Sequence, residues 1–181
     1  METVAHPESG LTKTRWTDQD LDAMSWHACQ IHAVAVTDDE GPPDDLTPEE
    51  FLEQDDLDDT APSGMALLFD LDYIVRRVEP SAPGRSYEFW VAPATLIFGS
   101  VMGITGDLRS ICLPLETRSL RRLGPVTPRH EAEWHLEGRD FDLRFQAWDF
   151  GLHIRRAPRY GRRVLRRADR GGISFDIQTF A

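Results

Sequence analysis

In the stretch Met65–Val78 (MALLFDLDYIVRRV), two kinds of side chain alternate along the chain. One set of alternate positions is wholly apolar: Met65, Leu67, Phe69, Leu71, Tyr73 and Val75. The other set includes Asp70, Asp72 and Arg76. Neighbouring side chains of a β-strand point to opposite faces. The period of two therefore predicts a strand with its apolar face in the core and its two aspartates facing water.

Shorter stretches on both sides are also predicted to be strands. They are residues 25–36, 87–92, 95–100, 132–136, 141–147, 151–155 and 173–177, with 101–112 as a bent continuation. Pro93 separates two of them, and the residues 137–140 (EGRD) predict a hairpin turn. Short helical turns are expected after Thr17, at 48–54 and at 120–123.

These elements indicate the fold class. Strands never alternate with long helical patterns, as a parallel sheet requires. We expect a mainly β domain, an antiparallel β-sandwich or open barrel with short peripheral helices. An α+β arrangement, with the helical pieces on one sheet face, is the alternative. A chain of 181 residues suits one such domain over 16–181, preceded by a flexible N-terminal tail at 1–15.

Charge is divided unevenly along the chain. The formal net charge is −11, but residues 1–59 carry 17 acids against two bases, whereas residues 60–181 carry 14 acids and 18 arginines. Twelve of the acids lie between Asp38 and Asp59, in a proline-containing stretch that predicts a solvated acidic insertion at 37–63. The total makes nucleic acid an unfavourable partner, because like charges repel.

The N-terminal sequence and the cysteines bear on the compartment. Residues 1–16 lack the basic start and apolar stretch of a signal peptide, and no apolar run reaches the roughly 20 residues that span a bilayer. We therefore expect a cytoplasmic protein that does not enter a membrane. Cys29 and Cys112 each lie in an apolar stretch and are predicted to be buried free thiols. No CxxC pair or nucleotide-binding loop is present, so no cofactor is expected.

Three segments carry a family resemblance: Trp26-His27, the LFDLDYI of 68–74 and the FWVAPATLIF of 89–98. Together they resemble a family of small bacterial proteins with a W-H-D segment, an L-D-h-D-Y-I strand and a V-A-P-A-T-L-x-F segment. The match runs from Trp26 to about Arg156. Ala28 stands where the family has an acid, and the acidic insertion is an addition. The resemblance implies a shared fold unit and no particular activity.

A set of His and Asp residues is the first candidate site. If the first two strands pair, Asp70 and Asp72 meet His27 or His32, and such a cluster of nitrogen and oxygen ligands suits a divalent metal. The candidate metal ligands are His27, Asp70 and Asp72. The alternative is structural, because aspartates on an exposed strand face aid solubility and pair with arginines across strands. Arg76 and Arg144 are the expected partners.

The second candidate is an arginine cluster. Eight arginines fall between residues 155 and 170, with Tyr160 among them. Arginines beside an aromatic ring hold phosphate or carboxylate groups, so a phosphate-bearing ligand or an acidic protein partner is one interpretation. In the other, the acidic stretch 38–59 or a neighbouring subunit supplies the counter-charges.

No complete catalytic set is present, and the leading hypothesis is a non-catalytic binding domain, an adaptor or immunity-like protein. A metal-dependent enzyme and a structural subunit of an assembly are the alternatives. The expected partner is an acidic protein or a second copy of the chain. The candidate binding residues are His27, His32, Asp70, Asp72, Tyr73, Arg155, Arg156, Tyr160 and Arg163.

Overall fold

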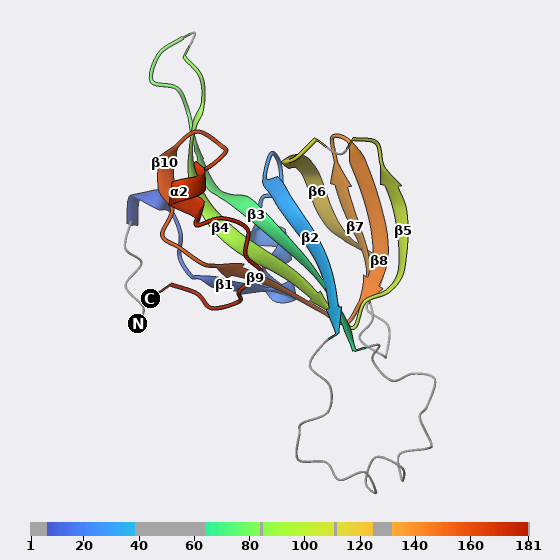
Figure 1. The fold of residues 1–181 in the computed structure, drawn as a ribbon. Coiled ribbons are helices and arrows are strands. Elements are labelled where there is room, and N and C mark those ends of the chain that lie inside the picture. The colour runs from blue at the N-terminus through green and yellow to red at the C-terminus, as the bar shows by residue number, and fades with distance from the viewer. Residues whose placement is uncertain (1–6, 39–63, 84, 111, 125–131, 181) are drawn as a thin grey trace, which may run out of the picture.

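Ten antiparallel strands form one open sheet in the computed structural model of the chain (Figure 1). The structure describes residues 7–38, 64–83, 85–110, 112–124 and 132–180. This confirms the mainly β prediction and its open antiparallel form. The helical turn predicted at 48–54 and most of the acidic insertion lie outside the described residues.

The bounds of the ten strands are as follows. They are β1 (Arg15–Thr17), β2 (Gln30–Asp38), β3 (Met65–Val78), β4 (Glu88–Gly99), β5 (Met102–Leu108), β6 (Leu115–Leu123), β7 (Ala132–Gly138), β8 (Phe141–Ala147), β9 (Asp149–Ile154) and β10 (Arg159–Gly161). The helical pieces are η1 (Pro7–Ser9), η2 (Asp18–Ala23) and α2 (Arg167–Arg170).

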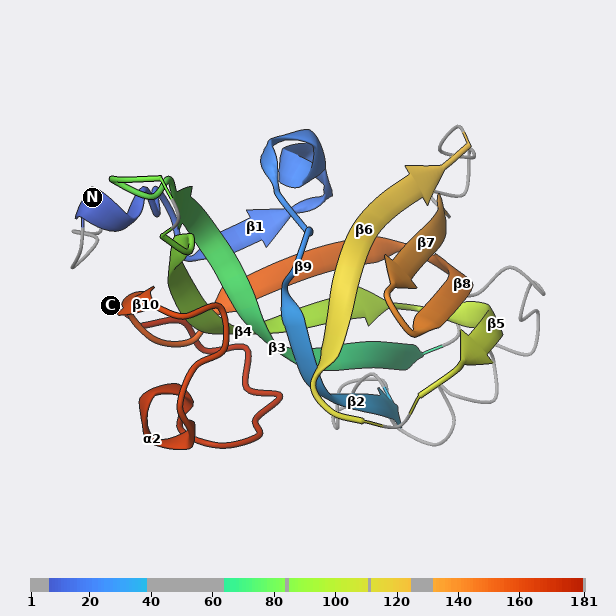
Figure 2. The same ribbon diagram turned by 90° about the horizontal axis from the view of Figure 1, so that it is seen from above.

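The sheet consists of two arms that share one short joint. Its order is β1-β9-β4-β3-β2-β6-β7-β8-β5, and β10 also pairs with β4. Strands β2 and β6 pair at two positions, Gln30 with Glu116 and Ile31 with Leu115. Beyond that joint they diverge, so the arm of β6, β7, β8 and β5 swings away from the arm of β3 and β4 (Figure 2).

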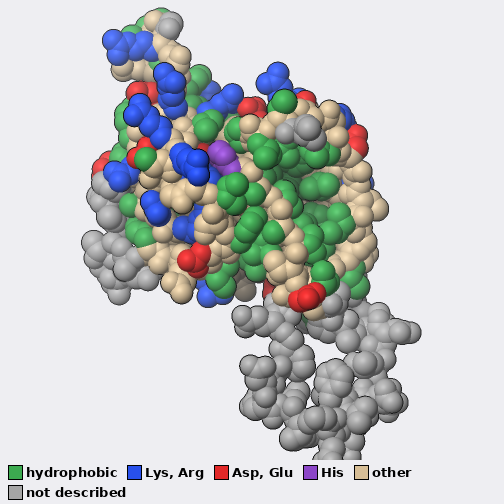
Figure 3. All heavy atoms as spheres, viewed as in Figure 1, with side chains coloured by type: hydrophobic (Ala, Val, Ile, Leu, Met, Phe, Trp, Pro, Cys, Tyr) green, Lys and Arg blue, Asp and Glu red, His purple; other side chains and the backbone are tan. Residues whose placement is uncertain are grey.

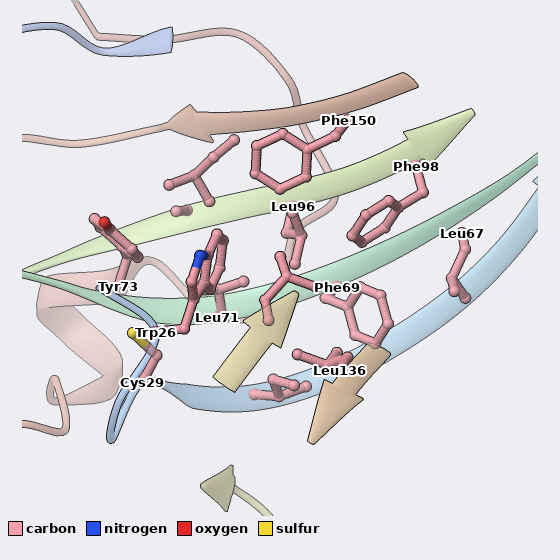
Figure 4. Packing of buried hydrophobic residues seen from close by; sticks show 14 of the residues in the cluster. Trp26, Cys29, Leu67, Phe69, Leu71, Tyr73, Leu96, Phe98, Leu136 and Phe150 are labelled. Atoms are coloured by element: carbon pink, nitrogen blue, oxygen red, sulfur yellow. The ribbon is translucent and has the colours of Figure 1, made fainter. Parts of the chain in front are cut away.

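The core lies between the two arms. Leu67, Phe69, Leu71 and Tyr73 of β3 are buried on one face, as the alternation predicts. Phe98 of β4 is the centre of an aromatic group, with ring centroids 4.7 Å from Phe145 and 5.1 Å from Trp134. Figure 4 shows Phe69, Phe98 and Leu136 pointing into the same space. Edge-to-face contacts of this kind add to the burial of large apolar area.

The opposite face of β3 corrects one expectation. Asp70 and Asp72 were predicted to face water, but both are fully buried, with 0% exposure. The reason is a cover supplied from far along the chain. Arg155, Leu165 and Asp176 of the C-terminal segment hydrogen-bond to β3 and β4, and α2 of the same segment lies over these strands (Figure 1). β3 is therefore a central strand that is buried on both faces.

One predicted strand break and one predicted helical turn were wrong. Residues 87–92 and 95–100 form one strand, β4, with Pro93 inside it. Pro93 fits because it falls in the gap between the β10 pairing, which ends at Val91, and the β9 pairing, which begins at Ala94. Residues 120–123 belong to β6 rather than to a helical turn, because Leu120 is buried opposite Leu136 of β7.

Three further boundaries differ from the predictions. Residues 25–29 precede β2, which begins at Gln30. Residues 173–177 run without strand structure, although they pack against β4 through the Asp176 carbonyl, which accepts from the Thr95 hydroxyl at 2.7 Å. From residue 7 onward the predicted tail contributes to the core, since Leu11 is 4% exposed. The hairpin of β7 and β8 around residues 138–141 is confirmed.

The helical turn after Thr17 is also confirmed, as η2. The Thr17 N–H donates to Asp20 Oδ2 at 2.9 Å, so one otherwise unpaired donor at the start of the helix is satisfied. Of the two thiols, Cys29 is buried as predicted, and burial raises its pKa to about 12. Cys112 is exposed, contrary to expectation, because it lies in the connection between β5 and β6. Within the described ranges, no helix is long and apolar enough to cross a membrane.

Candidate binding site

Asp70 lies between two guanidinium groups. Arg170 Nη1 donates to its Oδ2 at 2.9 Å and Nη2 donates to its Oδ1 at 3.0 Å, which is the two-pronged geometry that suits arginine and carboxylate. Arg155 Nη2 donates to the same Oδ1 at 2.5 Å. The side chains of the two arginines are 5% and 7% exposed. The carboxylate is therefore neutralised from two sides in a buried environment.

Asp72, two positions further along β3, is hydrogen-bonded to three residues from other parts of the chain. His32 Nε2 of β2 lies 3.0 Å from Oδ2, and the Leu165 N–H donates to the same oxygen at 2.9 Å. Arg170 Nε donates to Oδ1 at 3.1 Å. Burial alone would raise the pKa of this carboxyl, but the hydrogen bonds from His32 and Leu165 and the charge of Arg170 hold the pKa below its ordinary value.

The two arginines arrive from opposite ends of the C-terminal segment. Arg155 follows β9, and its Nη1 also donates to Thr95 Oγ1 at 3.3 Å and to the Ser174 carbonyl. Arg170 ends α2, and its Nη1 donates to the Gly172 carbonyl at 2.7 Å. We call Asp70, Asp72, Arg155 and Arg170 the ionic cluster. The cluster contains two carboxylates and two guanidiniums, so its formal charges balance. Its hydrogen bonds hold residues 155–174 against the sheet.

A glycine makes the turn after α2 possible. Gly171 has a φ of 81°, in the left-handed region that other residues seldom adopt. A Cβ at this position would lie 2.3 Å from Nη2 of Arg156. The chain therefore needs glycine for the backbone turn, whereas the exposed Arg156 side chain can move aside, and the turn brings the Gly172 carbonyl to Arg170.

The candidate metal ligands do not come together. The structure brings His32 to Asp72, whereas His27 is exposed and lines a pocket with Arg76 and Arg163. Both aspartates already hold guanidinium groups, and a buried carboxylate neutralised in this way is a poor cation ligand. Across residues 7–38, 64–83, 85–110, 112–124 and 132–180, no group of three or more His, Cys, Asp or Glu residues is arranged to hold a metal ion.

The other predicted binding residues have three different environments. Tyr73 belongs to the core, where its ring lies 5.6 Å from that of Trp26 and burial raises its pKa. Tyr160 is exposed on β10, where its hydroxyl donates to Glu88 and its ring lies 5.4 Å from Trp90. Arg163 Nη1 pairs with Glu116 at 2.7 Å.

Five arginines of the C-terminal segment stay on the surface, and we call them the arginine face. Among the described residues, no carboxylate forms an ion pair with any of them: Arg156, Arg159, Arg162, Arg166 and Arg167. Figure 3 shows Lys and Arg side chains gathered on the side of the molecule that carries β10 and α2, while hydrophobic side chains dominate the side of β2 and β8. The alternative prediction, that the acidic stretch 38–59 supplies counter-charges to these arginines, falls almost wholly on residues outside the described ranges.

Sequence reasoning missed one member of the ionic cluster and two groups that bind to it. Arg170 was counted among the arginines but not selected, and Thr95 and the Leu165 N–H were not considered. The usable signal was Asp-x-Asp within an otherwise apolar strand, since a buried carboxylate must be paired. Nothing local to Met65–Val78 identifies residues about a hundred positions away as the partners.

Comparison with known proteins returned no match, whether to a family model, to a curated protein or to a solved structure. The family resemblance of the three segments therefore stays a prediction.

Proposed function

We propose that this protein is a non-catalytic binding domain that recognises an acidic protein partner through the arginine face. The observation that carries the proposal is the state of Arg156, Arg159, Arg162, Arg166 and Arg167, which are exposed and have no ion-pair partner among the described carboxylates. Five like charges on one short segment repel one another, so binding of an anionic surface lowers the free energy. Arginine also offers a planar fork of donors that matches carboxylates.

The ionic cluster gives this face a fixed frame. Arg155 and Arg170 bracket the segment and are held on Asp70, so the exposed arginines between them start from a defined backbone. A preorganised surface loses less conformational entropy on binding than a free chain does. Adaptor and immunity-like roles both fit a domain of this kind.

An acidic protein fits better than nucleic acid. The chain carries a net charge of −11, which opposes the binding of a long polyanion. Binding to nucleic acid depends chiefly on contacts with many phosphates, which a strongly negative protein opposes. A folded protein with a local acidic patch meets the arginine face alone.

The direct experiment measures binding of a short, fluorescently labelled acidic peptide, hexaglutamate, by fluorescence anisotropy at low and moderate salt. The variant Arg162→Gln/Arg166→Gln/Arg167→Gln is expected to weaken binding by about tenfold or more, because each lost contact of this type contributes a fraction of a kcal/mol to about 1 kcal/mol. Binding is expected to weaken as salt increases.

The matched control is Arg118→Gln/Arg139→Gln/Arg144→Gln, which removes the same charge from exposed arginines of β6, β8 and the β7–β8 turn. It is expected to change the affinity less than about twofold, the response of distant surface charges that screening weakens. Equal weakening by both triple variants would show that binding follows net charge and not this face. Tighter binding of a single-stranded hexanucleotide than of hexaglutamate would overturn the choice of partner.

A further inference from the structure

A second cationic site lies beside β3 and β4, apart from the arginine face. A pocket of about 350 Å³ is lined by residues of three segments: the turn before β2, the end of β3 with the start of β4, and the C-terminal segment. Its polar lining consists of Ser25, His27, Arg76, Arg77, Tyr87 and Arg163. No Asp or Glu is among the described residues that line it. We call it the Tyr87 pocket.

The end of β3 is irregular where it lines this pocket. The pairing with β4 shifts between Ile74, opposite Val91, and Arg76, opposite Trp90, so Val75 is an extra residue. A β-bulge of this kind re-aims the side chains that follow it. Arg76 and Arg77, the two residues that follow this bulge, both line the pocket.

An aromatic ring fixes one of these arginines. The Arg77 guanidinium lies 3.5 Å from the centroid of the Tyr87 ring, a cation–π contact that leaves the N–H groups at the edge of the guanidinium for a ligand. Arg163 is oriented by Glu116 at 2.7 Å, and Arg76 Nη1 donates to the Glu8 carbonyl at 3.0 Å. Each guanidinium therefore has one contact that orients it.

The backbone beside the pocket is strained. Ala28 has a φ of 67°, in a region that residues with a Cβ seldom adopt, and it also lines the pocket, next to His27. Such conformations cost about 1–3 kcal/mol and are concentrated at binding sites. The turn that contains Ala28 brings His27 and Ser25 to the same opening as the arginines.

We propose that the Tyr87 pocket binds a phosphomonoester carried on an aromatic or apolar body. Arg163 is already paired with Glu116, which leaves Arg76 and Arg77 without an ion-pair partner among the described carboxylates. Two such guanidinium charges and a serine hydroxyl suit a phosphomonoester, which carries about two negative charges and three acceptor oxygens, better than a single carboxylate. Phe89, Ile74 and the Tyr87 ring supply the apolar wall for the body. The volume falls within the range of about 300–1,000 Å³ that is usual for small-molecule sites.

The test is isothermal titration of the full chain with four probes: phenyl phosphate, inorganic phosphate, phenylacetate and phenol. Phenyl phosphate is expected to bind in saturable fashion and at least about fivefold more tightly than the other three, because it alone combines the dianion with the ring. Equal binding of phenylacetate would identify a carboxylate site and overturn the proposal. So would the absence of saturation by phenyl phosphate at about 10 mM, which corresponds to less than about 3 kcal/mol of binding.

Two variants locate the bound phosphate. Arg77→Gln is expected to weaken phenyl phosphate binding by about tenfold, and Arg77→Lys by less, because lysine keeps the charge but loses the planar fork. Arg167→Gln, on the arginine face, is the control and is expected to leave binding unchanged. Unchanged binding by Arg77→Gln would place the phosphate elsewhere and overturn the proposal. Because the arginine-face triple variant leaves all pocket residues intact, failure of either proposal is distinguishable from failure of the other.

Discussion

The arginines of residues 155–170 divide into two groups with opposite environments. Arg155 and Arg170 are buried on Asp70, with side chains 7% and 5% exposed. Arg162, Arg166 and Arg167 are exposed and have no carboxylate partner among the described residues. All of them come from one short stretch of similar composition. Arg163 belongs to neither group, because it is exposed but paired with Glu116. A residue type repeated in one segment can thus serve the fold at two positions and remain without an ion pair to the described carboxylates at five others.

The two groups differ in the state of the neighbouring residues after a guanidinium has been removed by mutation. A buried ion pair adds little net stability compared with apolar residues of the same shape, but removing one partner leaves the other charge buried and uncompensated. An exposed arginine leaves only water behind. Mutation of a buried arginine should therefore lower the free energy of unfolding far more than the same mutation of an exposed one.

The largest expected effect is that of Arg170→Met. Loss of this guanidinium leaves Asp70 with one partner and Asp72 with His32 and Leu165, so the free energy of unfolding is expected to fall by about 3–5 kcal/mol. Unfolding in urea, monitored by tryptophan fluorescence, measures it. A loss below about 1 kcal/mol, the range of exposed pairs, would contradict the burial of this cluster.

A smaller effect is expected for Asp72→Asn, which keeps the shape of the side chain but not its charge. It weakens hydrogen bonds from Arg170, His32 and Leu165, and we expect a loss of about 2–3 kcal/mol at neutral pH. Urea unfolding measures this loss too, with Asp107→Asn in the exposed pair with Arg109 as the control. The control is expected to lose no more than about 1 kcal/mol.

Acid should remove the difference between Asp72→Asn and the wild type. The pKa of Asp72 is lower in the folded protein than its ordinary value of 3.8. Its contribution to stability is therefore complete above pH 3.8 and is lost as the pH falls through the folded-state pKa. Unfolding curves at a series of pH values below neutrality should show the two proteins converging below pH 3.8. A gap that stays constant into acid would mean that the charge of Asp72 is not what matters.

The smallest effect is expected on the exposed side of the comparison. Arg166→Met changes the same residue type in the same way as Arg170→Met, four positions earlier. The free energy of unfolding should change by no more than about 0.5 kcal/mol, because the side chain is exposed. If Arg166→Met lowered the free energy of unfolding about as much as Arg170→Met, Arg166 would be needed for the fold. The arginine face could then not be regarded as free to bind a partner.

Sequence reasoning succeeded where a local pattern determines the structure. The alternation of Met65–Val78 predicted β3 with its ends, and the capped turn after Thr17 and the hairpin after Gly138 followed from short-range rules. It failed where a distant segment decides. The polar face of β3 was assigned to water because its cover, residues 155–174, carries an arginine pattern that resembles a surface.

The same limit explains two smaller errors. Pro93 was treated as a strand break because its neighbours on the β9 and β10 side could not be known from the sequence. Residues 120–123 were treated as a helical turn because the buried position of Leu120 depends on β7. In the candidate site, the sequence grouped His27 and His32 with Asp70 and Asp72 without choosing a pair, and the structure places His32 beside Asp72. Arg170 could be assigned only once the turn at Gly171 was in view.

Hydrogen exchange at one amide tests most directly whether the ionic cluster holds the C-terminal segment. The Leu165 N–H, which lies between Arg155 and Arg170 along the chain, donates to Asp72 Oδ2 at 2.9 Å. If the cluster holds the segment, this amide is strongly protected in the wild type, and Arg170→Met accelerates its exchange by about a hundredfold or more, whereas Arg166→Met leaves the rate unchanged. Exchange of the wild-type Leu165 amide at the rate of an unstructured peptide would contradict it.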